Sequence, residues 1–399
     1  MKQIYTILII LFFYSLTLSA QTNTNFKSTV FIGHANRTQT LDSLIENASS
    51  LALDVNDYKK EFYNAITDNN NADSLLILVA NKFFTHLAYG NHAPLLEYQN
   101  AKFKTNAYDV SGLVKWYANN KTLLELVKYF TYCSKEVSVI LDSLKFYQAI
   151  PNINKATILS KAANDFRWFN AIKQKNRVII VNIPSTQLKA YDSNKLVLNM
   201  RVIVGNKKTK TNTLSAQVNS ILLNPYWTVP KSIIKNEMFE KFASDKDFFI
   251  KNDYELLDTK NKIVAVSTID FDKYAPDNFP FTVRQNTGLD NSLGLLKIDF
   301  ESPASIYLHD TPNKKLFANT NRFYSHGCVR MEKPIEIGKW LLANNKIAID
   351  TFDFKKPEKY SRPIPIPVTI PTQIIIWYSL IDFDKNGTLK FYKNVYNLN

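Results

Sequence analysis

The chain has 399 residues, more than one ordinary hydrophobic core needs, so we expect two or three domains. Its 45% hydrophobic and 13% aromatic content excludes an intrinsically disordered protein. The formal net charge of +14 favours anionic partners, such as a carboxylate-rich polymer or an anionic membrane surface, although evenly spread lysines explain most of it as solvated surface. The sequence has no helix-turn-helix, zinc-finger or aromatic RNA-binding pattern, which argues against a nucleic-acid partner.

The first twenty residues have the pattern of an export signal. Lys2 supplies a positive charge, an apolar run extends from Ile4 to Leu18, and small residues precede a predicted cleavage site after Ala20. An uncleaved anchor is the alternative, for which the apolar run is short. We therefore expect residues 1–20 to be a signal peptide, and the exported remainder to have no membrane span.

Residues 21–172 are predicted to form an all-helical scaffold domain. Leu41, Leu44, Ile45 and Ala48 are spaced as on one face of a helix. Later stretches, such as "SLLILVANKFFTHLAYG" and "TLLELVKYFTYCSKEVSVILDSLKFYQAI", continue this pattern.

The pattern changes at Arg177, where β-rich runs separated by turn signals begin. We assign residues 173–352 to a mainly-β domain. Within it, residues from about 230 to 279 are charged, first helical and then loop-like, and predict an insertion lying over the sheet as a lid. Residues 353–399 predict a proline-protected extended segment and a β-hairpin turned by "DKNG", packing on the rest. The expected fold class is α+β.

Histidine and cysteine are scarce, yet they gather in "IYLHDTPNKKLFANTNRFYSHGCVRM", residues 306–331. This stretch holds two of the five histidines and one of the two cysteines. The other cysteine, Cys133, lies in a helix-like stretch and is predicted to be a buried structural thiol. Cys328 is then an unpaired thiol in an oxidising compartment, which calls for a chemical explanation.

Acyl transfer is one such explanation. A thiol becomes a good nucleophile only with a base or a positive field beside it, and His309 could be the base for Cys328. The side chain of Asp310 should point to the opposite face of the strand, but its backbone carbonyl could hold the imidazole. Gly327 lets the backbone turn, so that the N–H groups of Gly327 and Cys328 can meet an oxyanion.

Two other interpretations remain open from the residues alone. A buried cysteine near a histidine is often merely structural. Alternatively, His309, His326 and Cys328 could bind zinc, although no fourth histidine or cysteine is close and Asp310 is the only nearby carboxylate.

The pattern His-x15-Ser-His-Gly-Cys-Val-Arg, residues 309–330, resembles the signature of the L,D-transpeptidase (YkuD-type) catalytic domain. Further stretches, including "VNIPSTQLKAYDSNKLVLNMRVIVG", "LNPYWTVPKSI" and "RPIPIPV", are similar to the large periplasmic murein L,D-transpeptidases of Gram-negative bacteria. The resemblance implies that the insertion is a lid-like capping subdomain. It also shows one departure, because there is no room here for the small peptidoglycan-binding module that such proteins usually carry.

The resemblance also implies roles for individual residues. It makes Cys328 the nucleophile and His309 its general base, oriented by the carbonyl of Asp310. It requires no metal or organic cofactor. The remaining implied residues are the backbone groups of His326, Gly327 and Cys328 as oxyanion hole, and Tyr307, Ser325 and Arg330 as substrate-binding residues.

In such enzymes the substrate is a tetrapeptide stem of peptidoglycan. The thiolate attacks the carbonyl of the third residue, releases D-Ala, and transfers the acyl group to an amine of another stem, giving a 3–3 cross-link in cell-wall biogenesis. The implied location is the periplasm, and carbapenems are the implied covalent inhibitors. The alternatives are an L,D-carboxypeptidase with water as acceptor, an enzyme with a protein amine as acceptor, another cell-wall thiol amidase or hydrolase, and a catalytically silent wall-binding protein.

Overall fold

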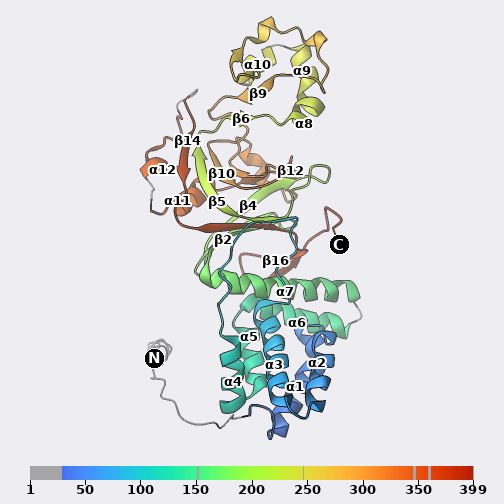
Figure 1. The fold of residues 1–399 in the computed structure, drawn as a ribbon. Coiled ribbons are helices and arrows are strands. Elements are labelled where there is room, and N and C mark those ends of the chain that lie inside the picture. Colours follow the sequence, from blue (N-terminus) through green and yellow to red (C-terminus); the bar gives the residue numbers. More distant parts are fainter. Residues whose placement is uncertain (1–28, 151, 246, 345–346, 358–360, 399) are drawn as a thin grey trace.

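The computed structural model describes residues 29–150, 152–245, 247–344, 347–357 and 361–398. The molecule is elongated: helices occupy one end, a large sheet lies in the middle, and a small subdomain forms the other end (Figure 1). The predicted signal peptide lies outside the described residues. Within these residues, no helix combines the length and the apolar character needed to cross a bilayer. The arrangement confirms the α+β fold class.

The helical end is built from helices with clear start and stop signals. Thr122 and Glu125 form a capping box at the start of α5, and the Ser134 hydroxyl caps α6. Gly90, with a φ of 80°, ends α3. The helices are α1 (Ala35–Glu46), α2 (Asn56–Thr67), α3 (Ala72–Tyr89), α4 (Val110–Asn120), α5 (Leu123–Tyr132), α6 (Lys135–Ala149) and α7 (Ile153–Lys175).

Helix α7 joins the helical end to the sheet. Every residue from Asp165 to Lys173 is buried. Phe169 packs edge-on against Trp377, with ring centroids 4.4 Å apart. The ammonium of Lys173 lies 3.7 Å from the carboxylate of Glu136 and 4.6 Å from the centre of the Tyr191 ring. The helices and the sheet therefore share one continuous interface.

The main sheet closes on itself. Its strands run in the order β1-β5-β10-β11-β13-β4-β3-β2-β15, and β15 also pairs with β5, while β12 pairs with β4 and β14 with β5. Closure leaves few exposed edges. The strands are β1 (Tyr98–Gln99), β2 (Arg177–Asn182), β3 (Gln187–Asp192), β4 (Lys195–Gly205), β5 (Leu214–Leu223), β10 (Leu296–Phe300), β11 (Leu308–His309), β12 (Phe323–Ser325), β13 (Val329–Met331), β14 (Ile364–Pro367) and β15 (Thr372–Trp377).

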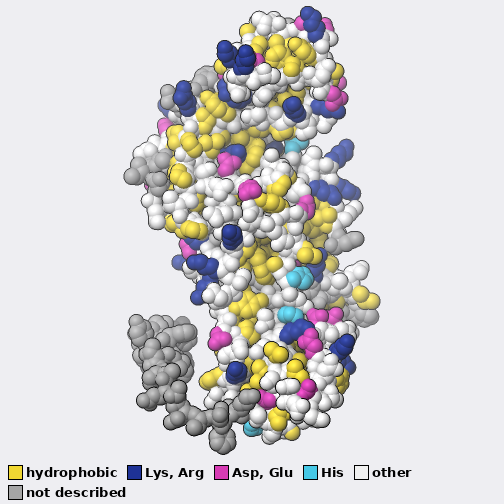
Figure 2. All heavy atoms as spheres, in the orientation of Figure 1, with side chains coloured by type: hydrophobic (Ala, Val, Ile, Leu, Met, Phe, Trp, Pro, Cys, Tyr) yellow, Lys and Arg dark blue, Asp and Glu magenta, His cyan; other side chains and the backbone are white. Residues whose placement is uncertain are grey.

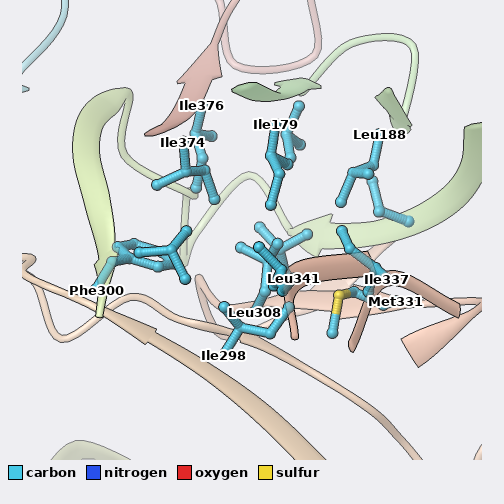
Figure 3. Close-up of a cluster of buried hydrophobic side chains, with 14 of the residues drawn as sticks. Ile179, Leu188, Ile298, Phe300, Leu308, Met331, Ile337, Leu341, Ile374 and Ile376 are labelled. Carbon is cyan, nitrogen blue, oxygen red and sulfur yellow. The ribbon is translucent and has the colours of Figure 1, made fainter. Parts of the chain in front are cut away.

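The inside of this sheet is a dry aliphatic core. Helix α11 (Pro334–Leu341), followed by α12 (Ile347–Thr351), directs Ile337 and Leu341 into it. Figure 3 shows these two side chains among residues from six strands. The strand residues labelled there are Ile179, Leu188, Ile298, Phe300, Leu308, Met331, Ile374 and Ile376.

The insertion forms a small subdomain with its own aromatic core, and we call it the lid. Its buried residues include Phe242, Phe249 and Phe271. The loop expected in the second half of the insertion is wrong in part, because that half also forms strands. In chain order the lid contains β6 (Trp227–Thr228), α8 (Lys231–Ile233), a π-helical turn (Ile234–Met238), α9 (Phe239–Ser244), α10 (Asp247–Lys251), β7 (Tyr254–Leu257), β8 (Ile263–Val264) and β9 (Thr282–Gln285), with the strand order β6-β9-β7-β8.

The surface of the lid is mixed in character. Figure 2 shows hydrophobic side chains gathered at this end of the molecule, with Lys and Arg side chains around them. Ile250 and Ile263 are exposed hydrophobic residues of the lid.

The C-terminal tail supplies a central strand of the main sheet. All six residues of β15 are buried, and the strand lies between β2, which is parallel to it, and β5, which is antiparallel. The tail continues into a hairpin of β16 (Ile381–Phe383) and β17 (Leu389–Phe391) that packs near α7.

We predict that Ile374→Ala lowers the free energy of unfolding by about 2–5 kcal/mol, because it leaves a cavity at a fully buried position in β15. Ile364→Ala, in the same tail but 44% exposed, should cost less than about 1 kcal/mol. Urea unfolding followed by circular dichroism measures both. Equal losses in the two variants would contradict the central position of β15.

Candidate active site

Two neighbouring strands bring the predicted catalytic residues to one cleft. Strands β11 and β13 are parallel, and their register places His309 opposite Arg330. Cys328 directly precedes β13. His309, Cys328 and Arg330 all line a cleft of about 870 Å³, and residues of the lid form its other wall.

His309 is held as a neutral imidazole. Its ring is buried, and Nδ1 lies 2.5 Å from the carbonyl oxygen of Asp310. Burial lowers the pKa of His309 to about 3, and the positive charges of Arg330 and Lys297 act in the same direction. When Nδ1 donates its hydrogen to the Asp310 carbonyl, Nε2 is the free lone pair of the ring.

The Asp310 carboxylate has a separate role. It accepts a hydrogen bond from the backbone N–H of Leu295 at 3.0 Å and forms an ion pair with Lys314. It is therefore engaged away from the imidazole, and only the backbone carbonyl of Asp310 contacts the ring of His309.

The Cys328 thiol is also held in its neutral form. Burial raises its pKa, while hydrogen bonding from Tyr307 and the charges of Lys297 and Arg330 oppose the rise. The sulfur lies 3.8 Å from the carbonyl oxygen of Ser305. Among the described residues, no hydrogen bond joins Cys328 to His309. The resting site is thus a thiol and a neutral imidazole that share one cleft.

The turn around Gly327 fixes the position of Cys328. Gly327 has a φ of 114°, in the region that favours glycine, and its N–H donates to Ser325 Oγ at 3.2 Å. Ser325 Oγ in turn donates to the carbonyl of Cys328 at 2.5 Å, so the buried Ser325 hydroxyl is used inside the turn. In the described part of the chain, the N–H groups of His326 and Cys328 have no acceptor.

Residues far away in the sequence support this turn, and the sequence analysis missed them. Thr211 Oγ1 donates to the carbonyl of Gly327 at 2.7 Å and accepts from the N–H of Gly205 at 2.8 Å. The hydroxyl of Tyr396 donates to the Gly205 carbonyl at 2.6 Å. A Cβ at Gly205 would lie 2.1 Å from the carbonyl oxygen of Thr209, so this close approach requires glycine. No local motif marks these contacts.

Tyr307 lines the cleft next to the thiol, and Lys297 lies against its ring. The ammonium of Lys297 lies 4.2 Å from the centre of the Tyr307 ring and 2.7 Å from the Asp299 carboxylate. Burial raises the pKa of Tyr307, and the neighbouring Cys328 raises it further, while Trp227 opposes the rise. Trp227 and Lys297 were not singled out from the sequence.

Arg330 has spare hydrogen-bonding capacity at the floor of the cleft. Its Nε is buried and has no hydrogen-bond partner among the described residues. Burial lowers its pKa, opposed by Cys328. An unused donor on a cation at this position can receive a carboxylate.

The lid touches the turn that carries Cys328 through a hydrogen-bonded contact between Glu237 and His326. Nε2 of His326 lies 2.5 Å from Oε1 of Glu237, which is on the π-helical turn. The two side chains are 38% and 46% exposed. The pair therefore stands at an open part of the cleft.

The zinc interpretation has no support from the side-chain geometry. Within the described ranges, no three His, Cys, Asp or Glu side chains are placed to hold a metal ion together. The prediction for Cys133 is wrong, because this residue is exposed. It lies at the end of α5, where its thiol donates to the carbonyl of Phe130 at 3.1 Å.

Comparison with known proteins identifies the domain that carries this cleft. Residues 176–349 match the YkuD family, described as the L,D-transpeptidase catalytic domain. A Haemophilus influenzae protein described as "Putative L,D-transpeptidase" is 30% identical over 247 residues, which is 61% of this chain and 50% of that protein. Residues 176–349 therefore resemble the YkuD-type L,D-transpeptidase catalytic domain, and the chain spans about half the length of the curated relative it matches.

Solved structures of L,D-transpeptidases overlap with the chain only loosely. One from Mycobacterium smegmatis is 10% identical, with a TM-score of 0.22, and the match covers 51% of this chain and 58% of that one. L,D-transpeptidase 3 from Mycobacterium tuberculosis is also 10% identical, with a TM-score of 0.24 and coverages of 50% and 60%. TM-scores this low do not support a structural assignment.

We predict that alkylation of Cys328 by iodoacetamide accelerates about tenfold per pH unit from neutral pH up to at least about pH 8.5, the ordinary thiol value. The raised pKa of the thiol keeps the thiolate fraction small until that range. The measurement uses a Cys133→Ser background, because Cys133 is exposed, and Cys133→Ser with Cys328→Ala gives the blank. A rate that levels off between pH 6 and 7 would show a preformed thiolate–imidazolium pair instead.

Proposed function

We propose that this protein is a peptidoglycan L,D-transpeptidase in which Cys328 is the nucleophile and His309 the general base. The observation that carries the proposal is the placement of both side chains in one cleft of a YkuD-like domain, with His309 in β11 and Cys328 directly before the adjacent parallel strand β13. The substrate is a tetrapeptide stem, and the place of action is the periplasm of a Gram-negative bacterium.

In the first half-reaction the enzyme is acylated. Nε2 of His309 takes the thiol proton while the Cys328 sulfur forms a bond to the carbonyl carbon of the third stem residue. The tetrahedral intermediate then expels D-Ala: the C–N bond breaks, and the leaving amine takes the proton from His309. A thioester remains on Cys328.

The neutral state of Cys328 and His309 before substrate binding is compatible with this proton transfer. Because burial disfavours both the thiolate and the imidazolium, the proton moves only when the substrate brings the two side chains into contact. The Cys328 sulfur must turn from the carbonyl of Ser305 toward the ring. The carbonyl of Asp310 then stabilises the imidazolium through Nδ1.

The oxyanion is received by backbone N–H groups of residues 326–328. Those of His326 and Cys328 have no other acceptor among the described residues. The N–H of Gly327 is engaged by Ser325 Oγ, so it joins the oxyanion hole only by exchanging that weak bond of 3.2 Å for the substrate. Arg330 and Tyr307 bind the rest of the stem.

In the second half-reaction an amine of a neighbouring stem attacks the thioester. A C–N bond forms, the C–S bond breaks, and the proton of the amine passes through His309 to the thiolate, which completes a 3–3 cross-link. Water in place of the amine gives a tripeptide and makes the enzyme an L,D-carboxypeptidase. No metal or organic cofactor takes part in this chemistry.

We predict that a carbapenem adds its mass once to residues 21–399 and not to the Cys328→Ala variant. The strained lactam is an acyl donor, and only Cys328 stands beside a base. Intact-protein mass spectrometry measures the adduct, and Cys133→Ser serves as the matched control that should still be labelled. Folded protein without any adduct would favour the silent wall-binding protein. In a separate incubation with a tetrapeptide stem, tripeptide without cross-linked product would favour the carboxypeptidase.

A further inference from the structure

The cleft has an uneven distribution of charge. Among the described residues that line it, the cations are Lys231 and Lys241 of the lid and Arg330 of the sheet. Glu237 is the only carboxylate in that lining. An anionic donor peptide therefore finds three cations there, whereas a cationic group finds one partner.

The Glu237 carboxylate is held in place by one oxygen, and its other oxygen can still accept a hydrogen bond. Its Oε1 is bound to Nε2 of His326 at 2.5 Å, and Oε2 has no hydrogen-bond partner among the described residues. The carboxylate is 46% exposed, so a ligand in the cleft can reach it. His326 is two residues from Cys328, so Glu237 contacts the turn that carries the thiol and lines the same cleft.

We propose that Glu237 binds the ammonium group of the acceptor amine and so makes the acyl-enzyme favour transfer to an amine over hydrolysis. This inference rests on the proposed function, because it concerns the second half-reaction. An alkylamine is a cation at neutral pH and would be repelled by the three cations of the cleft. A carboxylate in the same cleft offsets that repulsion for an amine and gives no advantage to water.

His326 acts as a positioning residue in this arrangement. Its imidazole holds Oε1, which leaves Oε2 available for a ligand. The bound ammonium releases one proton to solvent, the free amine forms the C–N bond to the thioester carbon, and its second proton passes to His309 and then to the departing sulfur of Cys328. The products are an amide and the free thiol.

A lid latch is the competing explanation for the pair. A latch would stabilise the closed cleft for donor and acceptor alike, although a half-exposed pair of this kind contributes little energy. The two explanations differ in which half-reaction depends on Glu237. Acceptor binding affects only the competition between amine and water.

The test uses Glu237→Gln, which keeps a hydrogen-bond acceptor for His326 and removes the negative charge. A synthetic tetrapeptide stem ending in D-Ala serves as donor and as amine acceptor, and mass spectrometry gives the ratio of cross-linked dimer to tripeptide. We expect Glu237→Gln to lower this ratio about fivefold, the size of a half-exposed charge interaction. With hydroxylamine, a neutral acceptor at mildly alkaline pH, the ratio of hydroxamate to tripeptide should change less than twofold.

Glu240→Gln is the matched control. It removes the same charge from the same helical segment, but Glu240 is not in the cleft lining, so the dimer ratio should stay at the wild-type value. The inference is overturned if Glu237→Gln keeps the wild-type ratio, if hydroxylamine transfer falls equally, or if the variant slows carbapenem acylation as a latch would. Wild-type protein that forms no acyl-enzyme at all would overturn the proposed function, and this inference with it.

Discussion

Strand β5 is the element on which the rest of the structure depends. Its residues Leu214–Leu223 pair with β15 and then β14 along one edge, and with β1 and β10 along the other. One ten-residue strand thus joins the helical end, the catalytic sheet and the C-terminal tail. From β5 the hydrogen-bonded path continues through β10 and β11 to β13, so the separation of His309 and Cys328 is set by ladders that begin at β5. A site built on closed strands is positioned more rigidly than one built on loops.

The nucleophile turn shows the same dependence on distant segments. Thr211, from a loop before β5, holds the carbonyl of Gly327 next to Cys328, and Tyr396, from the C-terminal tail, holds the carbonyl of Gly205, whose N–H donates to Thr211. Their bonds occupy the carbonyls of Gly327 and Gly205. The N–H groups of His326 and Cys328 are left without protein partners within the described residues. The fold thus satisfies one side of the turn and leaves the other side for a substrate.

The sequence was informative where the relevant residues are close together in the chain. His309 and Cys328 stand nineteen positions apart in the printed sequence, and a local motif places them on neighbouring strands. The helical end could also be foreseen, because its caps and apolar spacing are local signals. The central place of β15, the support from Tyr396 and the contact of Glu237 with His326 depend on tertiary pairing, which no local pattern encodes. Cys133 was misjudged because helical spacing does not reveal that a helix ends at that residue and exposes it.

Burial has two opposing effects on the site. It keeps thiol and imidazole neutral, which lowers the reactivity of the free enzyme, and it strengthens every charge interaction that a bound substrate makes. A cleft walled by a lid can therefore stay unreactive until a peptide fills it and displaces water. Lys297 and Arg330 oppose burial at Cys328, because they favour the thiolate, and act with burial at His309, because they disfavour the imidazolium. The activated state is then an anionic sulfur among cations, formed when His309 takes the thiol proton. His309 later gives this proton to the departing amine.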